Sequence, residues 1–185
     1  MDTTAGRHTD AALPLTSVVS FLGPEAWDSA SPCEGWTAKD VLNHIIGSQR
    51  EFFADHGFDL GEQASLDDPS RAWREHTARV ADIVADKAAM DTAFDGYYGP
   101  ATIGDEFDLF YTWDMIVHRW DIATAAGLDD TFTDTELDRV EAGADVFGDE
   151  LYLDGVCVAG VRAPAGADRA TRVLARLGRR RRDAA

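Results

Sequence analysis

The chain has 185 residues and carries 34 acidic side chains against 17 lysines and arginines, a formal net charge of -17 at pH 7. An acidic surface repels a polyanion, so nucleic acid is excluded as a partner of the body of the protein. The two cysteines, Cys33 and Cys157, are too far apart in sequence for a zinc-finger spacing or a disulfide framework. The length suits one domain whose core needs no disulfides.

The ends of the chain indicate a cytoplasmic protein that does not enter a membrane. The first ten residues are polar and lack the apolar core of a signal peptide. No stretch approaches the roughly 20 apolar residues of a membrane-spanning helix. The end of the chain, residues 179–185, is expected to be a basic, disordered tail because it contains four consecutive arginines, Arg179, Arg180, Arg181 and Arg182. The alternative for this run is a contact with an anionic partner.

Two helices are predicted at the start of the chain. A 3.6-residue apolar repeat over residues 10–22 predicts the first, with Pro14 in its first turn, where proline is tolerated. Thr37 followed by Asp40 resembles a helix-capping pair, so the second helix is expected to begin there and to end at Gly57. Both helices carry an apolar stripe, which predicts that they pack against other helices.

The middle of the chain combines a third helix with an irregular stretch. Asp68 and Pro69 form an N-cap followed by proline at the first helical position, so a third helix is expected to begin there. Between residues 90 and 100 the pattern is irregular, and Asp95-Gly96 is a turn signal that allows a small hairpin. No larger sheet is expected.

Helices again dominate the second half of the chain. A fourth helix is predicted over residues 102–126 and a last one over residues 168–177. Between them, Thr133 and Glu136 form a capping box that predicts the start of a fifth helix. Short connections between successive helices are typical of an all-α bundle, which is expected to occupy residues 1–178.

The fourth predicted helix carries an acid and an imidazole on one face. Asp114 and His118 are four residues apart, so their side chains stack on the same side of the helix. The same stripe contains Trp113 and Val117 and is expected to face the interior. A carboxylate placed there costs several kcal/mol unless a partner compensates it. A divalent cation is one such partner, and helical bundles commonly hold metals between facing helices.

His44 is the third candidate ligand, because it lies on the apolar stripe of the second helix. Two imidazoles and one carboxylate make an open site with room for water or a substrate atom. Such a set fits Zn²⁺ in a tetrahedral arrangement, or Ni²⁺, Fe²⁺ or Mn²⁺ with additional waters. The alternative is a metal-free bundle, in which Asp114 and His118 bond to each other and His44 is an ordinary core residue.

Four further groups of residues have candidate roles. Asp121, one turn beyond His118, is a candidate to orient that imidazole, and the alternatives are an ion pair with Arg119 or a cap for the helix. Cys33 lies close to a helix start, where a thiol can have a lowered pKa, but the favoured interpretation is a small packing residue. Histidines with polar sequence neighbours are expected at the surface: His8, His56 and His76. Aromatic residues that are candidates either for pocket walls or for core packing are Trp36, Trp113, Tyr97 and Tyr98.

Two segments together resemble a known family. Residues 31–47, SPCEGWTAKDVLNHIIG, resemble the start of the second helix in the DinB-like superfamily, most closely the branch named for mycothiol-dependent maleylpyruvate isomerase. Residues 114–127, DMIVHRWDIATAAG, resemble the later signature of that branch, in which an acid-x-x-x-His is followed by Trp-Asp. Residues 155–179 are similar to the end of its single-domain actinobacterial members.

The resemblance implies a fold and a ligand set. The fold is an up-down-down-up four-helix bundle with a metal in its core. The family's ligands are a histidine on the second helix and an acid-plus-histidine pair on a later one, which map onto His44, Asp114 and His118. Zinc is the expected ion, with nickel, iron and manganese as alternatives. A homodimer is compatible with the family, although no apolar stripe requires one.

The resemblance also implies a chemistry. Enzymes of this superfamily use low-molecular-weight thiols such as mycothiol, whose sulfur a metal would bind and activate as a thiolate. The expected function is therefore a metal-dependent thiol S-transferase, or an isomerase-like enzyme, that acts on a small electrophile. The alternative is a non-catalytic metal-binding or sensor protein.

Two departures from the family pattern are visible. Asp114 stands where glutamate is frequent, and its shorter side chain would draw the ion toward the fourth helix or leave a water between them. The full maleylpyruvate isomerase also has a C-terminal domain that contributes to its active site. This chain is expected to lack that domain, so isomerisation of maleylpyruvate itself is not expected.

Overall fold

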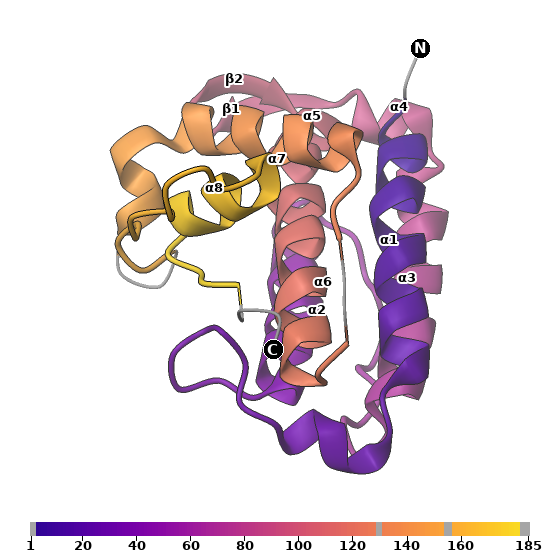
Figure 1. The fold of residues 1–185 in the computed structure, drawn as a ribbon. Coiled ribbons are helices and arrows are strands. Elements are labelled where there is room, and N and C mark those ends of the chain that lie inside the picture. The colour runs from indigo at the N-terminus through magenta and orange to yellow at the C-terminus, as the bar shows by residue number, and fades with distance from the viewer. Residues whose placement is uncertain (1–2, 129–130, 154–156, 182–185) are drawn as a thin grey trace. The chain divides into compact units, whose positions relative to one another are not determined.

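The structure is a computed structural model that describes residues 3–128, 131–153 and 157–181 (Figure 1). The chain divides into two compact units, Met1–Leu128 and Asp129–Ala185. The first contains α1 (Thr4–Phe21), η1 (Pro24–Asp28), α2 (Ala38–Asp55), α3 (Pro69–Val84), α4 (Lys87–Met90), β1 (Ala93–Gly96), β2 (Gly99–Thr102), α5 (Ile103–Phe107), η2 (Asp108–Thr112) and α6 (Trp113–Ala125). The second contains α7 (Asp134–Phe147), η3 (Gly148–Tyr152) and α8 (Arg169–Arg176). Helices dominate the described residues, so the predicted all-α class is confirmed.

Four long helices of the first unit form the bundle. α1 contacts α3 and α6, and α2 contacts the same two helices, so the four close a ring. Near the start of α3, the Ser70 hydroxyl donates to the Val19 carbonyl near the end of α1, so these two helices are antiparallel. Figure 1 shows α1 and α6 running in one direction and α2 and α3 in the other. This is the predicted up-down-down-up arrangement.

α1 begins earlier than predicted. Thr3 caps it by accepting a hydrogen bond from the Gly6 amide at 3.1 Å, so the helix starts at Thr4 and not near residue 10. Pro14 consequently lies inside the helix, where it supplies no amide proton to the backbone ladder. The prediction was wrong at this end because the residues before position 10 carry no apolar repeat.

Capping motifs start several helices where they were predicted. Thr37 and Asp40 form a full capping box at the start of α2, and Thr133 and Glu136 form another at α7. Asp68 caps α3 ahead of proline in the first turn. These caps satisfy amide groups that have no partner within the helix, so they fix where each helix begins.

The predicted hairpin is present, with its turn shifted. β1 and β2 pair antiparallel, with Gly96 opposite Gly99, so Tyr97 and Tyr98 occupy the turn rather than Asp95-Gly96. Gly99 has a φ of 105°, a conformation that favours glycine.

The fourth predicted helix is not one continuous α-helix. α5 and α6 are joined by η2, a π-helical turn that ends at Thr112, two residues before Asp114. A π-helical turn inserts an extra residue into the helix and rotates the side chains that follow it. The single apolar stripe predicted over residues 102–126 therefore changes face within η2.

A hydrophobic cluster fills one region of the bundle. Its aromatic centre is formed by Phe53 and Phe107, which are fully buried and lie 4.9 Å apart between ring centroids. The remaining members come from α2, the α2–α3 connection, α3, α4 and α5: Phe52, Leu60, Val80, Val84, Met90 and Ile103.

Two of the three histidines expected at the surface are buried, so that prediction was wrong for them. His8 shares the inner stripe of α1 with Ala11 and Leu15, and His76 lies between Trp73 and Val80 on α3. Helical position, and not the polarity of sequence neighbours, decides their burial. Burial lowers the pKa of His8 to about 4 and that of His76 to about 3. His56 is partly buried.

Ion pairs join the helices of the second unit. Arg169 of α8 pairs with Asp138 and Glu141 of α7. Arg179, predicted to begin a solvated tail, is buried and donates to the Leu177 carbonyl at 2.9 Å. Arg181 pairs with Asp168, and residues 182–185 lie outside the described residues. No helix in the described part of the chain is long and apolar enough to cross a membrane.

Candidate metal centre

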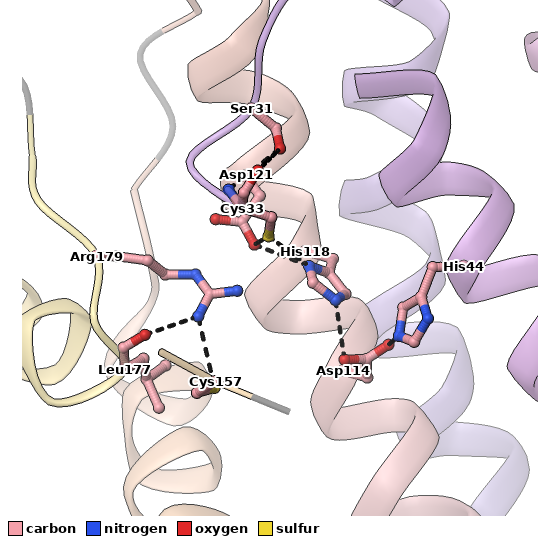
Figure 2. Close-up of polar contacts among 9 residues, drawn as sticks. All are labelled: Ser31, Cys33, His44, Asp114, His118, Asp121, Cys157, Leu177 and Arg179. Atoms are coloured by element: carbon pink, nitrogen blue, oxygen red, sulfur yellow. Dashed lines mark hydrogen bonds and ion pairs between the residues drawn. The ribbon is translucent and has the colours of Figure 1, made fainter. Parts of the chain in front are cut away.

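The structure brings His44, Asp114 and His118 together at the contact between α2 and α6 (Figure 2). Oδ2 of Asp114 lies 3.3 Å from Nε2 of His44, and Oδ1 of Asp114 lies 3.2 Å from Nε2 of His118. One ligand atom from each residue falls within 4.8 Å of the other two. One carboxylate thus spans two imidazoles that come from different helices.

The three side chains differ in exposure. His118 is 8% exposed, whereas Asp114 is 21% and His44 is 33% exposed. The cluster is therefore most buried at His118 and most exposed at His44.

The charges and hydrogen bonds within the cluster shift the pKa values of Asp114 and His118. Burial alone would raise the pKa of Asp114, but the charge of His118 and hydrogen bonds from His118 and His44 hold that pKa well below its usual range. Burial alone would lower the pKa of His118, but the charge of Asp114 and the hydrogen bonds of His118 with Asp114, Asp121 and Cys33 raise that pKa well above its ordinary value. The cluster thus holds an ionised carboxylate that favours a cation beside it.

The donor set fits a divalent cation. Two ligands at bond lengths of 2.0–2.1 Å in a tetrahedral site lie about 3.3 Å apart. The two nitrogen-to-oxygen distances at Asp114, 3.2 and 3.3 Å, are close to that spacing, and each imidazole faces a different oxygen of the carboxylate. Two imidazoles and a carboxylate leave coordination positions open, as in catalytic zinc sites. The role of these residues as ligands stays a prediction that this geometry supports.

Asp121 orients His118, as its position one turn along α6 indicated. Its Oδ2 lies 2.8 Å from Nδ1 of His118, and Asp121 is completely buried. Because a carboxylate accepts and does not donate, this contact places a proton on Nδ1 and directs Nε2 toward Asp114.

Cys33 was interpreted as a packing residue, but it contacts the site. Its Sγ lies 3.4 Å from Oδ2 of Asp121 and 4.0 Å from Nδ1 of His118. Figure 2 shows the thiol on the opposite side of the His118 ring from Asp114. Sequence spacing could not reveal this contact, because the loop before α2 reaches α6 only in the folded bundle.

Of the aromatic candidates, Trp36 is the one that packs on the imidazoles. Its ring centroid lies 5.1 Å from that of His44 and 6.3 Å from that of His118. Trp113 is buried in the core. Tyr97 and Tyr98 are exposed and contact Phe110.

Comparison with known proteins places the chain among relatives from mycobacteria. Two uncharacterized proteins of Mycobacterium tuberculosis, MT0763 from strain CDC 1551 / Oshkosh and Rv0738 from strain ATCC 25618 / H37Rv, are each 27% identical to it over 150 residues. Each match covers 80% of this chain and 81% of the relative. No solved structure matches the chain. Residues 9–123, which contain all three candidate ligands, match the family of the mycothiol maleylpyruvate isomerase N-terminal domain, and the chain belongs to that family.

Proposed function

We propose that this chain is a metal-dependent enzyme that attaches a low-molecular-weight thiol of the mycothiol type, through its sulfur, to a small electrophile, as an S-transferase or an isomerase-like enzyme. The observation that carries the proposal is that ligand atoms of His44, Asp114 and His118 lie within 4.8 Å of one another, with His44 and Asp114 partly exposed to solvent. The family supports the thiol, because its name refers to mycothiol.

Zinc is the ion that this donor set favours, with nickel, iron or manganese as alternatives. Three protein ligands with at least one open position are the usual arrangement of catalytic zinc. When bound, such an ion lowers the pKa of a thiol and presents the thiolate as a nucleophile. His44 Nε2, His118 Nε2 and the Asp114 carboxylate would hold it.

The surrounding residues position these ligands. Asp121 fixes the orientation and tautomer of His118 through the 2.8 Å contact with Nδ1. Trp36 covers one side of both imidazole rings and limits the access of water there. The partly exposed edge of His44 and Asp114 is left for the thiol and the electrophile.

The test begins with metal content. Untagged protein is analysed for bound metal in the wild type and in His44→Ala. The matched control is His56→Ala, at the C-cap of the same helix and outside the cluster. We expect the wild type and His56→Ala to hold one equivalent of metal more than His44→Ala. Metal content unaffected by His44→Ala would refute the proposed ligand set.

The second measurement addresses the thiol. Metal-loaded protein is titrated calorimetrically with mycothiol and then assayed for conjugation of the thiol to a model electrophile. We expect thiol binding that requires the metal and is lost in His44→Ala. If metal binds but neither thiol binding nor conjugation occurs, the transferase is rejected in favour of a non-catalytic metal-binding protein.

A further inference from the structure

We propose a second metal position on the other side of the His118 ring, formed by Sγ of Cys33, Nδ1 of His118 and Oδ2 of Asp121 and suited to a thiophilic cation such as Zn²⁺ or Cd²⁺. The three ligand atoms fall within 4.8 Å of one another. This set shares only His118 with the candidate site formed by His44 and Asp114.

The spacing of the three atoms agrees with that of a four-coordinate site. With metal–sulfur bonds near 2.3 Å and metal–nitrogen or metal–oxygen bonds near 2.1 Å, neighbouring ligands lie about 3.4–3.6 Å apart. The observed separations are 3.4 Å from Cys33 Sγ to Asp121 Oδ2 and 4.0 Å from Sγ to His118 Nδ1. The separation of Nδ1 from Oδ2 is 2.8 Å. Shifts of several tenths of an ångström therefore suffice to admit an ion.

The loop before α2 holds the thiol in place. The Ser31 amide donates to the Trp36 carbonyl at 2.8 Å, and the Trp36 amide donates to the Cys33 carbonyl at 3.0 Å, which closes a tight turn. Within that turn the Cys33 amide donates to the Ser31 hydroxyl at 3.1 Å. Gly35 accommodates the turn with a φ of 78°. A ligand fixed in this way loses little conformational freedom when a metal binds.

Charge and burial favour a cation at this place. His118 lies between two carboxylates, Asp114 at Nε2 and Asp121 at Nδ1, and Asp121 is completely buried. Carboxylate oxygens on both sides of the ring are ligands that a divalent cation accepts. Cys33 is only partly buried, so an ion can reach the sulfur from solvent.

The sulfur sets the preference of this position. Thiolate ligands bind soft cations such as zinc, cadmium and cuprous copper more tightly than they bind magnesium or calcium. Binding releases the Cys33 thiol proton and the His118 Nδ1 proton to solvent, and it requires no oxidant. When both positions are filled, His118 bridges the two cations through its two nitrogens. The second position does not depend on the proposed thiol transfer.

Cadmium is the probe for the test, because a thiolate–cadmium bond absorbs in the ultraviolet whereas imidazole and carboxylate ligands give no such band. Purified full-length protein is titrated with Cd²⁺ while absorbance and bound stoichiometry are followed. We expect the protein to bind two equivalents of Cd²⁺, one of which produces the thiolate–cadmium absorption band. In Cys33→Ala the band and one equivalent are lost, and circular dichroism establishes that this variant is folded.

Two further variants separate this position from the other candidates. Cys157→Ala, the matched control at the second cysteine, keeps the band and both equivalents. His44→Ala keeps the band and loses the other equivalent, so failure of the first site is distinguishable from failure of the second. Absence of the band in the wild type, or its persistence in Cys33→Ala, would overturn the proposal while leaving the His44 site intact.

Discussion

Nδ1 of His118 lies 2.8 Å from the buried carboxylate of Asp121, so without a cation at Cys33 a proton is held on Nδ1 while Nε2 faces Asp114. A metal held by His44 and Asp114 would therefore displace the proton of Nε2 and leave the one on Nδ1. A contact of this kind also raises the basicity of the ligating nitrogen. Residues that do not touch the ion are thus expected to determine how tightly it is held.

The first prediction concerns Asp121→Asn. The substitution preserves shape but removes the charge behind His118, so we expect metal affinity at the His44, Asp114 and His118 site to fall about 10- to 100-fold. Competition with a chromophoric chelator measures the change. Glu51→Gln, at an exposed position of α2, is the control and should bind as the wild type does. An unchanged affinity in Asp121→Asn would show that Asp121 does not tune this ligand.

The sequence predicted that His44, Asp114 and His118 lie close together, but it did not predict which residues surround them. His44, Asp114 and His118 could be identified because helical spacing and two family segments each indicate them. Cys33 could not be, because its contact with Asp121 joins a loop to a helix 88 positions away. Such contacts depend on tertiary packing that no local pattern encodes.

In the fold, too, local hydrogen-bond motifs were predicted correctly, whereas other features were not. The capping boxes at Thr37 and Thr133 were recognisable because they are local hydrogen-bond motifs. His8 was misplaced because the start of α1 was set too late, which removed it from the helix whose inner face it shares. The π-helical turn before Asp114 carries no sequence signal comparable to a cap.

The second prediction concerns the length of the acid at position 114. Asp114 already lies 3.2 and 3.3 Å from the two imidazole nitrogens, so an added methylene must fold back or displace one ring. We therefore expect Asp114→Glu to bind metal more weakly than the wild type and Asp114→Ala to lose it. Isothermal titration with Zn²⁺ compares the three proteins. Equal or tighter binding by Asp114→Glu would mean that the α2–α6 spacing does not select aspartate.

The third prediction is a loss of stability in mild acid. His8 and His76 stay neutral in the folded bundle, because burial lowers their pKa values to about 4 and about 3 from an ordinary 6.5. As the pH falls below 6.5, these histidines become protonated in the unfolded chain while they stay neutral in the folded protein. The free energy of unfolding therefore decreases as the pH falls from 6.5 toward the pKa values of the folded state. At pH 5 each histidine accounts for a loss of about 2 kcal/mol in the free energy of unfolding.

Urea denaturation at pH 7 and pH 5 measures this loss. His8→Leu removes one of the two buried titratable groups, so the loss of unfolding free energy between pH 7 and pH 5 should decrease by about half. The substitution breaks no hydrogen bond at Nε2, which has no partner among the described residues. Leu13→Ala, which changes an exposed side chain of the same helix without a titratable group, is the control and should keep the slope of the wild type. A slope unchanged by His8→Leu would show that His8 is not held neutral.

The last prediction compares two helical glycines. In α2, a Cβ at Gly47 would meet nothing within 4 Å, so Gly47→Ala should stabilise the protein by about 0.5–1 kcal/mol through helix propensity alone. In α5, a Cβ at Gly104 would lie 2.5 Å from the Thr4 hydroxyl and 3.2 Å from both Cβ and the carbonyl oxygen of Met90. The threonine can rotate away, but the Met90 backbone cannot, so Gly104→Ala should destabilise by about 1–3 kcal/mol.

Urea denaturation of both alanine variants tests this pair at pH 7. Opposite signs are expected, because the two substitutions have the same helix propensity and differ in the space around the added methyl group. Destabilisation by Gly47→Ala would mean that α2 needs glycine beside His44 for a reason other than space. A neutral Gly104→Ala would mean that α4 and α5 can separate without loss, and that Met90 does not fix their contact.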